Sequence, residues 1–125
     1  DIDNFKHLND TLGHQTGDQA LIHLSNVIRN ALRPSDSVAR YGGEEFILLL
    51  PDATIEAAAT TVERLQRELT KKYFMHENDR VLVTFSAGVA LRAPQESQEE
   101  VIGRADKAMY QAKRTGKNRV VKANN

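Results

Sequence analysis

The sequence predicts an α+β domain in which helices cover one sheet. Helical and extended segments follow one another in the order α-α-β-β-α-β-α-β along 125 residues, and this order favours a single sheet packed against helices. The clearest helical segments each carry one apolar stripe, so each is expected to pack against a partner. The extended segments are short and apolar, and the chain is long enough for one compact core.

The overall charge argues against a protein that binds nucleic acid by bulk electrostatics. The 17 Lys and Arg residues balance the 17 Asp and Glu residues, whereas binding to nucleic acid by bulk electrostatics needs a basic excess. A small anionic ligand held by a few local cations remains compatible. The chain has no cysteine, which excludes disulfide and thiolate chemistry and suits a reducing cytosol. No apolar run approaches the roughly 20 residues of a membrane span, and no signal peptide is present.

The first third of the chain predicts two helices. A short one is expected over residues 4–12, with Phe5, Leu8 and Leu12 at helical spacing. Gly13 and His14 are expected to end it, and Gly17 to mark the following turn. The second helix ends near Arg33, because the following proline disfavours helical geometry there. Its apolar stripe consists of Ala20, Leu21, Leu24, Val27, Ile28, Ala31 and Leu32.

A hairpin is expected next, with strands over residues 37–41 and 45–50. Gly42 and Gly43 join them, since paired glycines supply the positive φ angles that a tight hairpin needs. Residues 47–50 are continuously apolar, which predicts that the second strand is buried on both faces.

The remaining chain predicts a helix over residues 54–69, a strand over 81–91, a helix over 98–114 and an edge strand over 119–122. The strand alternates, so Val81, Val83, Phe85, Ala87 and Val89 share one face. Gly116 is suited to cap the last helix. Such an arrangement usually opens with a strand. Here that strand would end at Asp1 and lie outside the chain, which begins without methionine and is expected to be a piece of a longer protein.

Three acids have positions that allow metal chemistry. Glu44 and Glu45 follow the hairpin glycines, and Asp1 would lie at the end of the first strand. If that strand neighbours the hairpin, Asp1 and Glu44 converge at one end of the sheet. Converging carboxylates repel unless a cation separates them, and oxygen-rich sites of this kind suit Mg²⁺ together with substrate phosphates. The alternative is that these are solvated turn acids, which are common.

A second group consists of Asn9, His14 and Asp18. An asparagine amide and an aspartate carboxylate can read the donor edge of guanine, because the carboxylate accepts from N1–H and N2–H together. The alternatives are that Asp18 favours the dipole at a helix start, that Asn9 is solvated, and that His14 is a turn residue.

The cations form two further groups. Lys6, Lys113 and Lys117 can act as point charges for a triphosphate, although lysines at a helix C-terminus also complement its dipole.

Arg33 and Asp36 bracket the stretch RPSD, and Arg64 stands on the following helix. This set can clamp a phosphate bidentately. The alternative is a surface salt bridge, worth roughly 0–1 kcal/mol.

Taken together, these stretches resemble a known family. DIDNFKHLNDTLGHQTGD, RPSD, RYGGEEF, SAGVA and ADKAMYQAKRTGKN are similar to the motifs of the GGDEF domain, the diguanylate cyclase family. The likeness runs from Asp1 to about Val121, and Glu44 stands where the name-giving motif has Asp, an alternative that active members of the family also show. The resemblance implies a ferredoxin-like palm with a central antiparallel sheet and helices packed on it, similar to class III nucleotide cyclases and polymerase palms. Residues 1–125 would be a single such domain without its first strand.

The resemblance also implies a reaction in which two GTP molecules condense to cyclic di-GMP and two pyrophosphates. An antiparallel homodimer would form the active site between its protomers. Asp1, the Ile2 carbonyl and Glu44 would hold two Mg²⁺ ions, with Mn²⁺ as a substitute. Glu44 would help to deprotonate the attacking 3′-hydroxyl, and Glu45 would support the site. Lys117 stands where many members have Arg. A lysine there would keep the charge but lose the bidentate geometry of a guanidinium. The implied GTP contacts are Phe5, Lys6, Asn9, Asp18, Gly42, Gly43, Lys113 and Lys117.

The family also has an inhibitory R-x-x-D motif five residues before its glycines, and Asp36 is followed by five residues before Gly42. Arg33 and Asp36, joined by Arg64, would therefore bind the product. The further implied features are an N-terminal sensor, a cytoplasmic location, and no contact of this domain with membrane or nucleic acid polymer. The alternatives are a silent module that binds GTP or cyclic di-GMP, and the regulatory domain of a phosphodiesterase. A mononucleotide cyclase or a polymerase palm would leave the R-x-x-D spacing unexplained.

Overall fold

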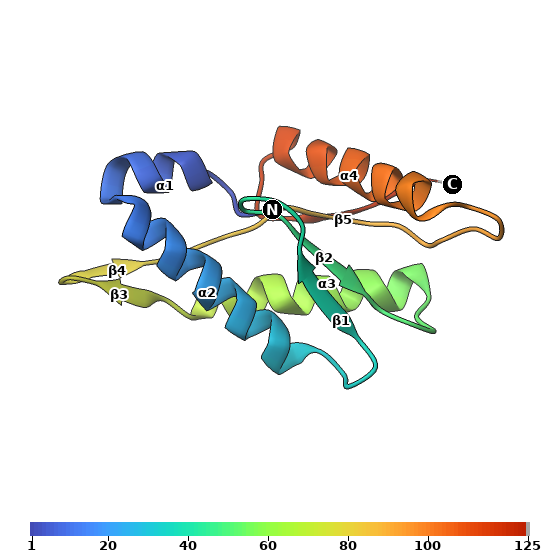
Figure 1. The fold of residues 1–125 in the computed structure, drawn as a ribbon, viewed down its shortest axis with the longest axis horizontal. Helices are drawn as coiled ribbons and strands as arrows, with labels where there is room; N and C mark the ends of the chain where they lie inside the picture. The colour runs from blue at the N-terminus through green and yellow to red at the C-terminus, as the bar shows by residue number, and fades with distance from the viewer. Residues whose placement is uncertain (125) are drawn as a thin grey trace.

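The computed structural model describes residues 1–124 (Figure 1). Helices and strands alternate much as the sequence predicts, and the α+β class is confirmed. None of the helices within residues 1–124 combines the length and the apolar composition that crossing a membrane requires. The elements, in chain order, are α1 (Phe5–Leu12), α2 (His14–Ala31), β1 (Ser37–Arg40), β2 (Phe46–Leu49), α3 (Ile55–Lys71), β3 (Phe74–His76), β4 (Asp79–Val81), β5 (Ala87–Val89), α4 (Gln98–Arg114) and β6 (Val120–Lys122).

The strands pair in three short ladders. β1 pairs with β2 and β3 with β4, both antiparallel. β5 pairs with β6 in parallel, because α4 carries the chain back between them. Residues 1–3 connect two of these ladders. Ile2 forms an antiparallel bridge with Phe85, and its N–H donates to the Glu44 carbonyl at 3.2 Å. The first residues of the chain therefore lie between the hairpin and the strand segment that leads into β5.

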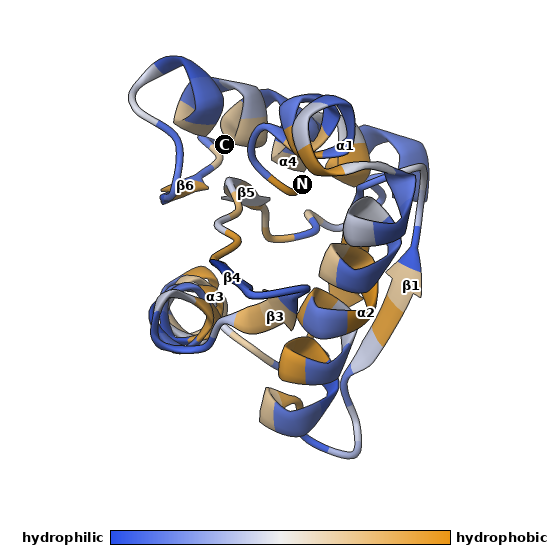
Figure 2. Cartoon of the chain, turned by 90° about the vertical axis from the view of Figure 1, so that its left-hand side faces the viewer, coloured by the Kyte–Doolittle hydropathy of each residue, from blue (hydrophilic) through white to orange (hydrophobic). Residues whose placement is uncertain are grey.

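The core lies where α2 and α3 face the strands. Figure 2 shows the apolar faces of both helices turned inward and their polar faces turned outward. The fully buried side chains include Ile2 and Leu65, each about 1% exposed. Burying a side chain of this size contributes roughly 1.5–3 kcal/mol, so the predicted stripes account for the packing of both helices. The main core residues are Ile2, Ala20, Leu21, Leu24, Val27, Ile28, Val62, Leu65, Leu69, Val81, Val83, Phe85 and Val89.

The turn between the first two helices differs from the prediction. α2 begins at His14, so Gly13 alone makes the turn, with a φ of 95°. Gly17 lies inside α2 and is buried, not in a turn. Its missing side chain matters for packing, because a Cβ there would lie 1.8 Å from Asn9 Oδ1. Glycine is expected in turns, but Gly17 lies within a helix because α1 and α2 approach each other closely at this position.

The hairpin also differs in two ways. Gly42 and Gly43 do not have positive φ angles; among the glycines of residues 1–124 only Gly13 and Gly116 do. A longer loop, closed by the Tyr41 N–H donating to the Glu45 carbonyl at 2.8 Å, makes a tight turn unnecessary. β2 is not buried on both faces, since Leu49 is 63% exposed. β2 pairs with β1, and the side of the strand that carries Leu49 is left to solvent because no second layer within residues 1–124 buries it there.

In the second half of the chain, one predicted strand is wrong and one predicted helix is confirmed. The strand expected over 81–91 is divided between β4 and β5, and the hairpin strand β3 was not predicted. Ala87 is only half-buried, whereas Val81, Val83, Phe85 and Val89 are buried as expected. α4 has its predicted bounds, because Ser97 and Glu100 form a capping box at its start.

Candidate functional site

The site is built around the first residues of the chain and the tip of the β1–β2 hairpin. The Ile2–Glu44 backbone hydrogen bond holds these two segments together. Asp3 N–H donates to the Thr84 carbonyl at 2.9 Å, and Ser86 N–H donates to the Asp1 carbonyl at 3.0 Å. Asp1 and the loop that carries Glu44 and Glu45 therefore lie at one end of the strands, where the sequence predicted that they would converge.

Lys113 on α4 neutralises the acids at this end. Its Nζ lies 3.3 Å from Asp1 Oδ1 and 3.7 Å from Asp3 Oδ1. The carboxylates of Asp1 and Asp3 are 9% and 1% exposed, so the cation offsets charges that are largely removed from water. Opposite charge at this distance stabilises two carboxylates that would otherwise repel each other.

The donors present fit a magnesium site that substrate would complete. Within residues 1–124, no group of three His, Asp or Glu side chains forms a ready metal site. The carboxylates of Asp1 and Glu44 and the backbone carbonyl of Ile2 are nevertheless hard oxygen donors of the kind that Mg²⁺ takes. This ion commonly fills its remaining positions with phosphates and water. Lys113 now lies against Asp1, so the cluster already accommodates a positive charge.

Arg40, which the sequence does not mark as a site residue, binds the backbone carbonyls at the hairpin tip. The Arg40 guanidinium donates to the Gly43 carbonyl at 2.7 and 3.0 Å and to the Gly42 carbonyl at 3.3 Å. A Cβ at either glycine would meet no atom within 4 Å. The carbonyls are therefore turned toward Arg40, and the space over the tip is open to a ligand.

The helix pair α1–α2 brings Asn9 against Gly17, the residue before Asp18. Asn9 Oδ1 points at Gly17, which precedes Asp18 on α2. This oxygen is buried, and no group within residues 1–124 forms a hydrogen bond with it. Because α2 starts at His14, Asp18 lies in its second turn, so a helix-capping role does not explain this residue. His14 is exposed in the first turn of α2.

The remaining candidates for GTP binding lie on α1 and in the turn after α4. Lys117 Nζ donates to Asn4 Oδ1 at 2.5 Å, which joins the turn after α4 to the start of α1. Phe5 is half-buried, with its ring close to Gly17. Lys6 is exposed on α1, and no bond or ion pair within residues 1–124 fixes its side chain.

The RPSD stretch forms a closed turn. The Arg33 guanidinium donates to Asp36 at 2.8–3.2 Å, and the Arg33 N–H donates to the same carboxylate at 2.9 Å. These hydrogen bonds lower the pKa of Asp36 and raise that of Arg33. Arg64 is exposed on α3, and no hydrogen bond within residues 1–124 joins it to this turn. The structure thus pairs two of the three residues expected to act together.

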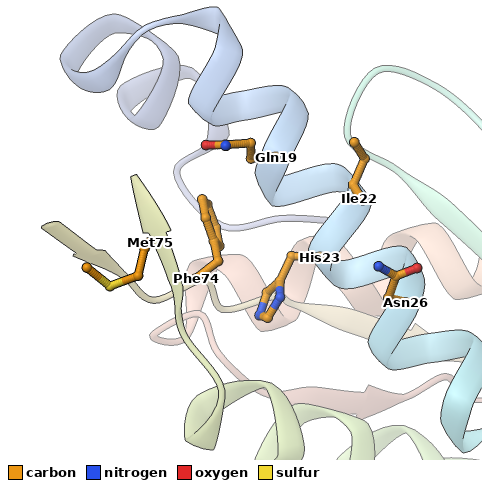
Figure 3. Close-up of a pocket in the computed structure, with 6 residues that line it drawn as sticks. All are labelled: Gln19, Ile22, His23, Asn26, Phe74 and Met75. Atoms are coloured by element: carbon orange, nitrogen blue, oxygen red, sulfur yellow. The ribbon is translucent and has the colours of Figure 1, made fainter. Parts of the chain in front are cut away.

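A surface hollow of about 260 Å³ lies elsewhere, between α2 and β3 (Figure 3). None of the predicted site residues lines it. Its polar groups are used within the fold, since His23 Nε2 lies 3.2 Å from the Lys72 carbonyl and its ring packs against Phe74. The lining residues are Gln19, Ile22, His23, Asn26, Phe74 and Met75.

Sequence reasoning missed Asp3. Its buried carboxylate accepts from Thr84 Oγ1 at 2.8 Å, Ser86 Oγ at 2.6 Å and Asn118 N–H at 2.9 Å. A signal was present, because Asp1 and Asp3 alternate in an extended segment and Thr84 and Ser86 alternate with apolar Val83 and Phe85.

Comparison with known proteins agrees with this geometry. The sequence profile described as "Diguanylate cyclase, GGDEF domain" matches residues 1–119. Diguanylate cyclase A of Treponema denticola is 40% identical over the whole of this chain, which spans 34% of that relative. The chain is therefore about a third as long as this relative.

Two solved structures have the same fold. The GGDEF domain of DgcB from Caulobacter crescentus, determined in complex with c-di-GMP, superposes with a TM-score of 0.93 at 42% identity, covering 98% of this chain and 73% of that one. The active GGEEF domain of a diguanylate cyclase from Vibrio cholerae gives a TM-score of 0.87 at 32% identity, covering 100% and 80%. On its sequence profile, its fold and the position of its GGEEF loop, the chain belongs to the GGDEF family of diguanylate cyclase domains.

Proposed function

We propose that this chain is the catalytic domain of a diguanylate cyclase, which condenses two GTP molecules to cyclic di-GMP and releases two pyrophosphates. The observation that carries the proposal is the hydrogen bond between Ile2 N–H and the Glu44 carbonyl, because it brings the Asp1 segment to the acidic hairpin tip. The family and the lysines beside this end support the same reading.

The metal-binding residues are Asp1 and Glu44 through their carboxylates and Ile2 through its carbonyl. Two bound Mg²⁺ or Mn²⁺ ions would lower the pKa of the attacking 3′-hydroxyl and neutralise charge on the phosphates. Glu44 accepts the proton of the attacking 3′-hydroxyl. Glu45 supports the site as a second carboxylate at the hairpin tip. Lys113 balances Asp1 until substrate arrives and then turns to the phosphates.

GTP is recognised at both of its ends. Asp18 accepts from the guanine N1–H and N2–H groups, and Asn9 completes the contact with the base. Lys6, Lys113 and Lys117 attract the triphosphate, and the backbone around Phe5, Gly42 and Gly43 approaches it closely. The chain thus mainly positions the substrate and stabilises charge.

Bond formation needs two copies of the site. The 3′-oxygen of one GTP attacks the α-phosphorus of the other, a P–O bond forms, and pyrophosphate leaves with the electrons of the bond that breaks. The reciprocal attack closes the ring. Each protomer holds one GTP, so we propose an antiparallel homodimer.

We propose further that cyclic di-GMP inhibits the enzyme at the Arg33–Asp36 turn, with Arg64 joining it. The guanidinium of Arg33 is presented at the surface and is 55% exposed, so it can exchange its contact with Asp36 for a phosphate of the product. The same turn supports the second candidate function, in which the domain is a silent receptor for cyclic di-GMP or GTP or the regulatory part of a phosphodiesterase.

We also propose that residues 1–125 are a single domain of a longer protein. Its parent carries an N-terminal sensor that sets dimerisation, and the domain works in the cytoplasm. This domain contacts neither membrane nor nucleic acid polymer.

The test is product formation by the purified full-length parent with GTP and Mg²⁺, followed by chromatography of the nucleotides. Glu44→Ala is the test variant, and Glu56→Ala, an acid in the first turn of α3, is the matched control. The proposal expects cyclic di-GMP from wild type and Glu56→Ala and none from Glu44→Ala. Tight binding of cyclic di-GMP without any product would favour the receptor.

A further inference from the structure

We propose that Asp3 is a positioning residue that places the two lysines Lys113 and Lys117 for the triphosphate. This inference rests on the proposed function and concerns a residue that the proposal leaves without a role. Asp3 is buried, and its side chain is 1% exposed. A carboxylate removed from water in this way is tolerated only when it is paired and hydrogen-bonded.

The partners of Asp3 come from three separate segments. Thr84 Oγ1 and Ser86 Oγ donate from the strand segment that also pairs with residues 1–3. The Asn118 N–H donates from the turn after α4, to the same Oδ2 that accepts from Thr84. Lys113 Nζ lies 3.7 Å from Oδ1. One carboxylate thus ties the strand, the end of α4 and the following turn together.

The turn after α4 needs such a tie. Lys117 and Asn118 are consecutive residues with φ angles of 61° and 47°, a left-handed conformation that non-glycine residues keep only when their surroundings hold them. Besides Asp3, the Gln66 side chain donates to Asn118 Oδ1 at 3.0 Å, and Lys117 N–H donates to the Ala112 carbonyl at 3.0 Å.

Both lysines consequently lie over residues 1–4. Lys117 reaches Asn4 Oδ1, and Lys113 lies between Asp1 and Asp3. Without the second oxygen and the charge of the Asp3 carboxylate, Lys113 keeps only the ion pair with Asp1, and the Asn118 N–H, which donates to Oδ2, faces an amide donor in place of its acceptor. The turn can then relax and carry Lys117 away from Asn4. Asp3 therefore acts on the phosphate end of GTP through the lysines, while the guanine end is contacted by Asn9 and Asp18 on other elements.

The test compares nucleotides with and without the β- and γ-phosphates. Affinities of the full-length parent for GTP and for GMP are measured by calorimetry, with cyclic di-GMP binding as a reporter of the Arg33–Asp36 turn. The variant is Asp3→Asn, which keeps the shape but removes the charge and presents an amide donor within the same set of donors. Asp106→Asn, an exposed acid on α4, is the matched control.

The expected result is a GTP dissociation constant raised at least ten-fold, with those for GMP and cyclic di-GMP changed less than two-fold. Equal weakening of GTP and GMP, or an unchanged GTP affinity, would overturn the inference. If Asp3→Asn does not fold, Ser86→Ala removes one hydrogen bond while leaving the charge. It should then weaken GTP about three-fold without affecting GMP, and an unchanged GTP affinity would be the contrary result.

Failure of the proposed function looks different in the same measurements. A wild-type parent that binds GTP but makes no cyclic di-GMP would disprove the cyclase, while the selective effect of Asp3→Asn on GTP could still be observed. A wild-type parent that binds no GTP would refute both.

Discussion

Two groups in this molecule pair a carboxylate with a cation, and they are built in opposite ways. Asp3 is buried and draws its partners from residues 81 to 115 positions away in sequence. Asp36 receives its side-chain hydrogen bonds from Arg33, three positions away. The Asp36 side chain is only 2% exposed, but its partner Arg33 is 55% exposed. The first group depends on segments from the whole chain, whereas the second is a local turn with one further hydrogen bond, from Arg33 to the Pro51 carbonyl at 2.9 Å. We infer that changes near Asp3 affect stability and GTP together, and that changes at Arg33 affect product binding without affecting GTP.

The strongest way to disturb the GTP side is Gly17→Ala. The new Cβ would lie 1.8 Å from Asn9 Oδ1 and 3.2 Å from the Phe5 ring, so Asn9 must move. Overpacking of this kind lowers the free energy of unfolding by up to about 3 kcal/mol, and GTP affinity should fall about ten-fold with the displaced amide.

Denaturant unfolding and GTP calorimetry check this prediction. Gly103→Ala is the matched control, because a Cβ there meets no atom within 4 Å and alanine favours the helix by up to about 1 kcal/mol. Equal stability of the two variants would contradict the contact.

The next effect is expected from Lys113→Gln. Removing the cation leaves the Asp1 and Asp3 carboxylates without their neutralising charge. The expected loss is about 1–2 kcal/mol of unfolding free energy, below the range for a fully buried pair because Lys113 is a quarter exposed.

Mg²⁺ sharpens this prediction. If Asp1 is a metal ligand, the ion should raise the melting temperature of Lys113→Gln by more than that of wild type, because no lysine competes with it. Lys107→Gln, on the exposed side of α4, should behave like wild type. A Mg²⁺ effect identical in all three proteins would argue against a metal at Asp1.

Arg33→Ala tests the surface group. The turn loses its ion pair with Asp36 and the hydrogen bond to the Pro51 carbonyl, and cyclic di-GMP affinity should fall roughly ten-fold or more with the lost guanidinium. The GTP affinity should hardly change, and the melting temperature should fall only modestly, because Asp36 keeps its charge but is left without its partner. Arg67→Ala on α3 is the control. A large loss of stability would show that this turn is not local.

The smallest effect is expected from Glu96→Gln, beyond both groups. Arg104 and the Ala93 N–H hold the pKa of Glu96 at about 2, below its usual 4.5. A lowered pKa contributes stability that is fully present above pH 4.5 and is lost as the pH falls toward 2. Melting curves of wild type and Glu96→Gln should therefore differ at neutral pH and converge below pH 4.5. The exposed Glu99→Gln variant should follow wild type throughout.

The sequence by itself determined what depends on neighbouring residues. α4 has its predicted bounds because its start is capped by Ser97 and Glu100, and its end is followed by Gly116 with a φ of 129°. The stripes of α2 and α3 form the core for the same reason, since helical periodicity is local. The Arg33–Asp36 pair belongs to this class.

The tertiary structure decided what depends on distant contacts. The sequence predicts a turn at Gly17, because the crowding of this residue by Asn9 and Phe5 exists only after α1 packs on α2. The apolar run predicts that Leu49 is buried, but it is exposed, because burial of a strand's face depends on which layers pack against the sheet. Asp3 went unnoticed because its donors lie more than 80 positions away. Motif spacing located the acids and lysines of the GTP side along the chain, and only folding brought Lys113 within ion-pair distance of Asp1.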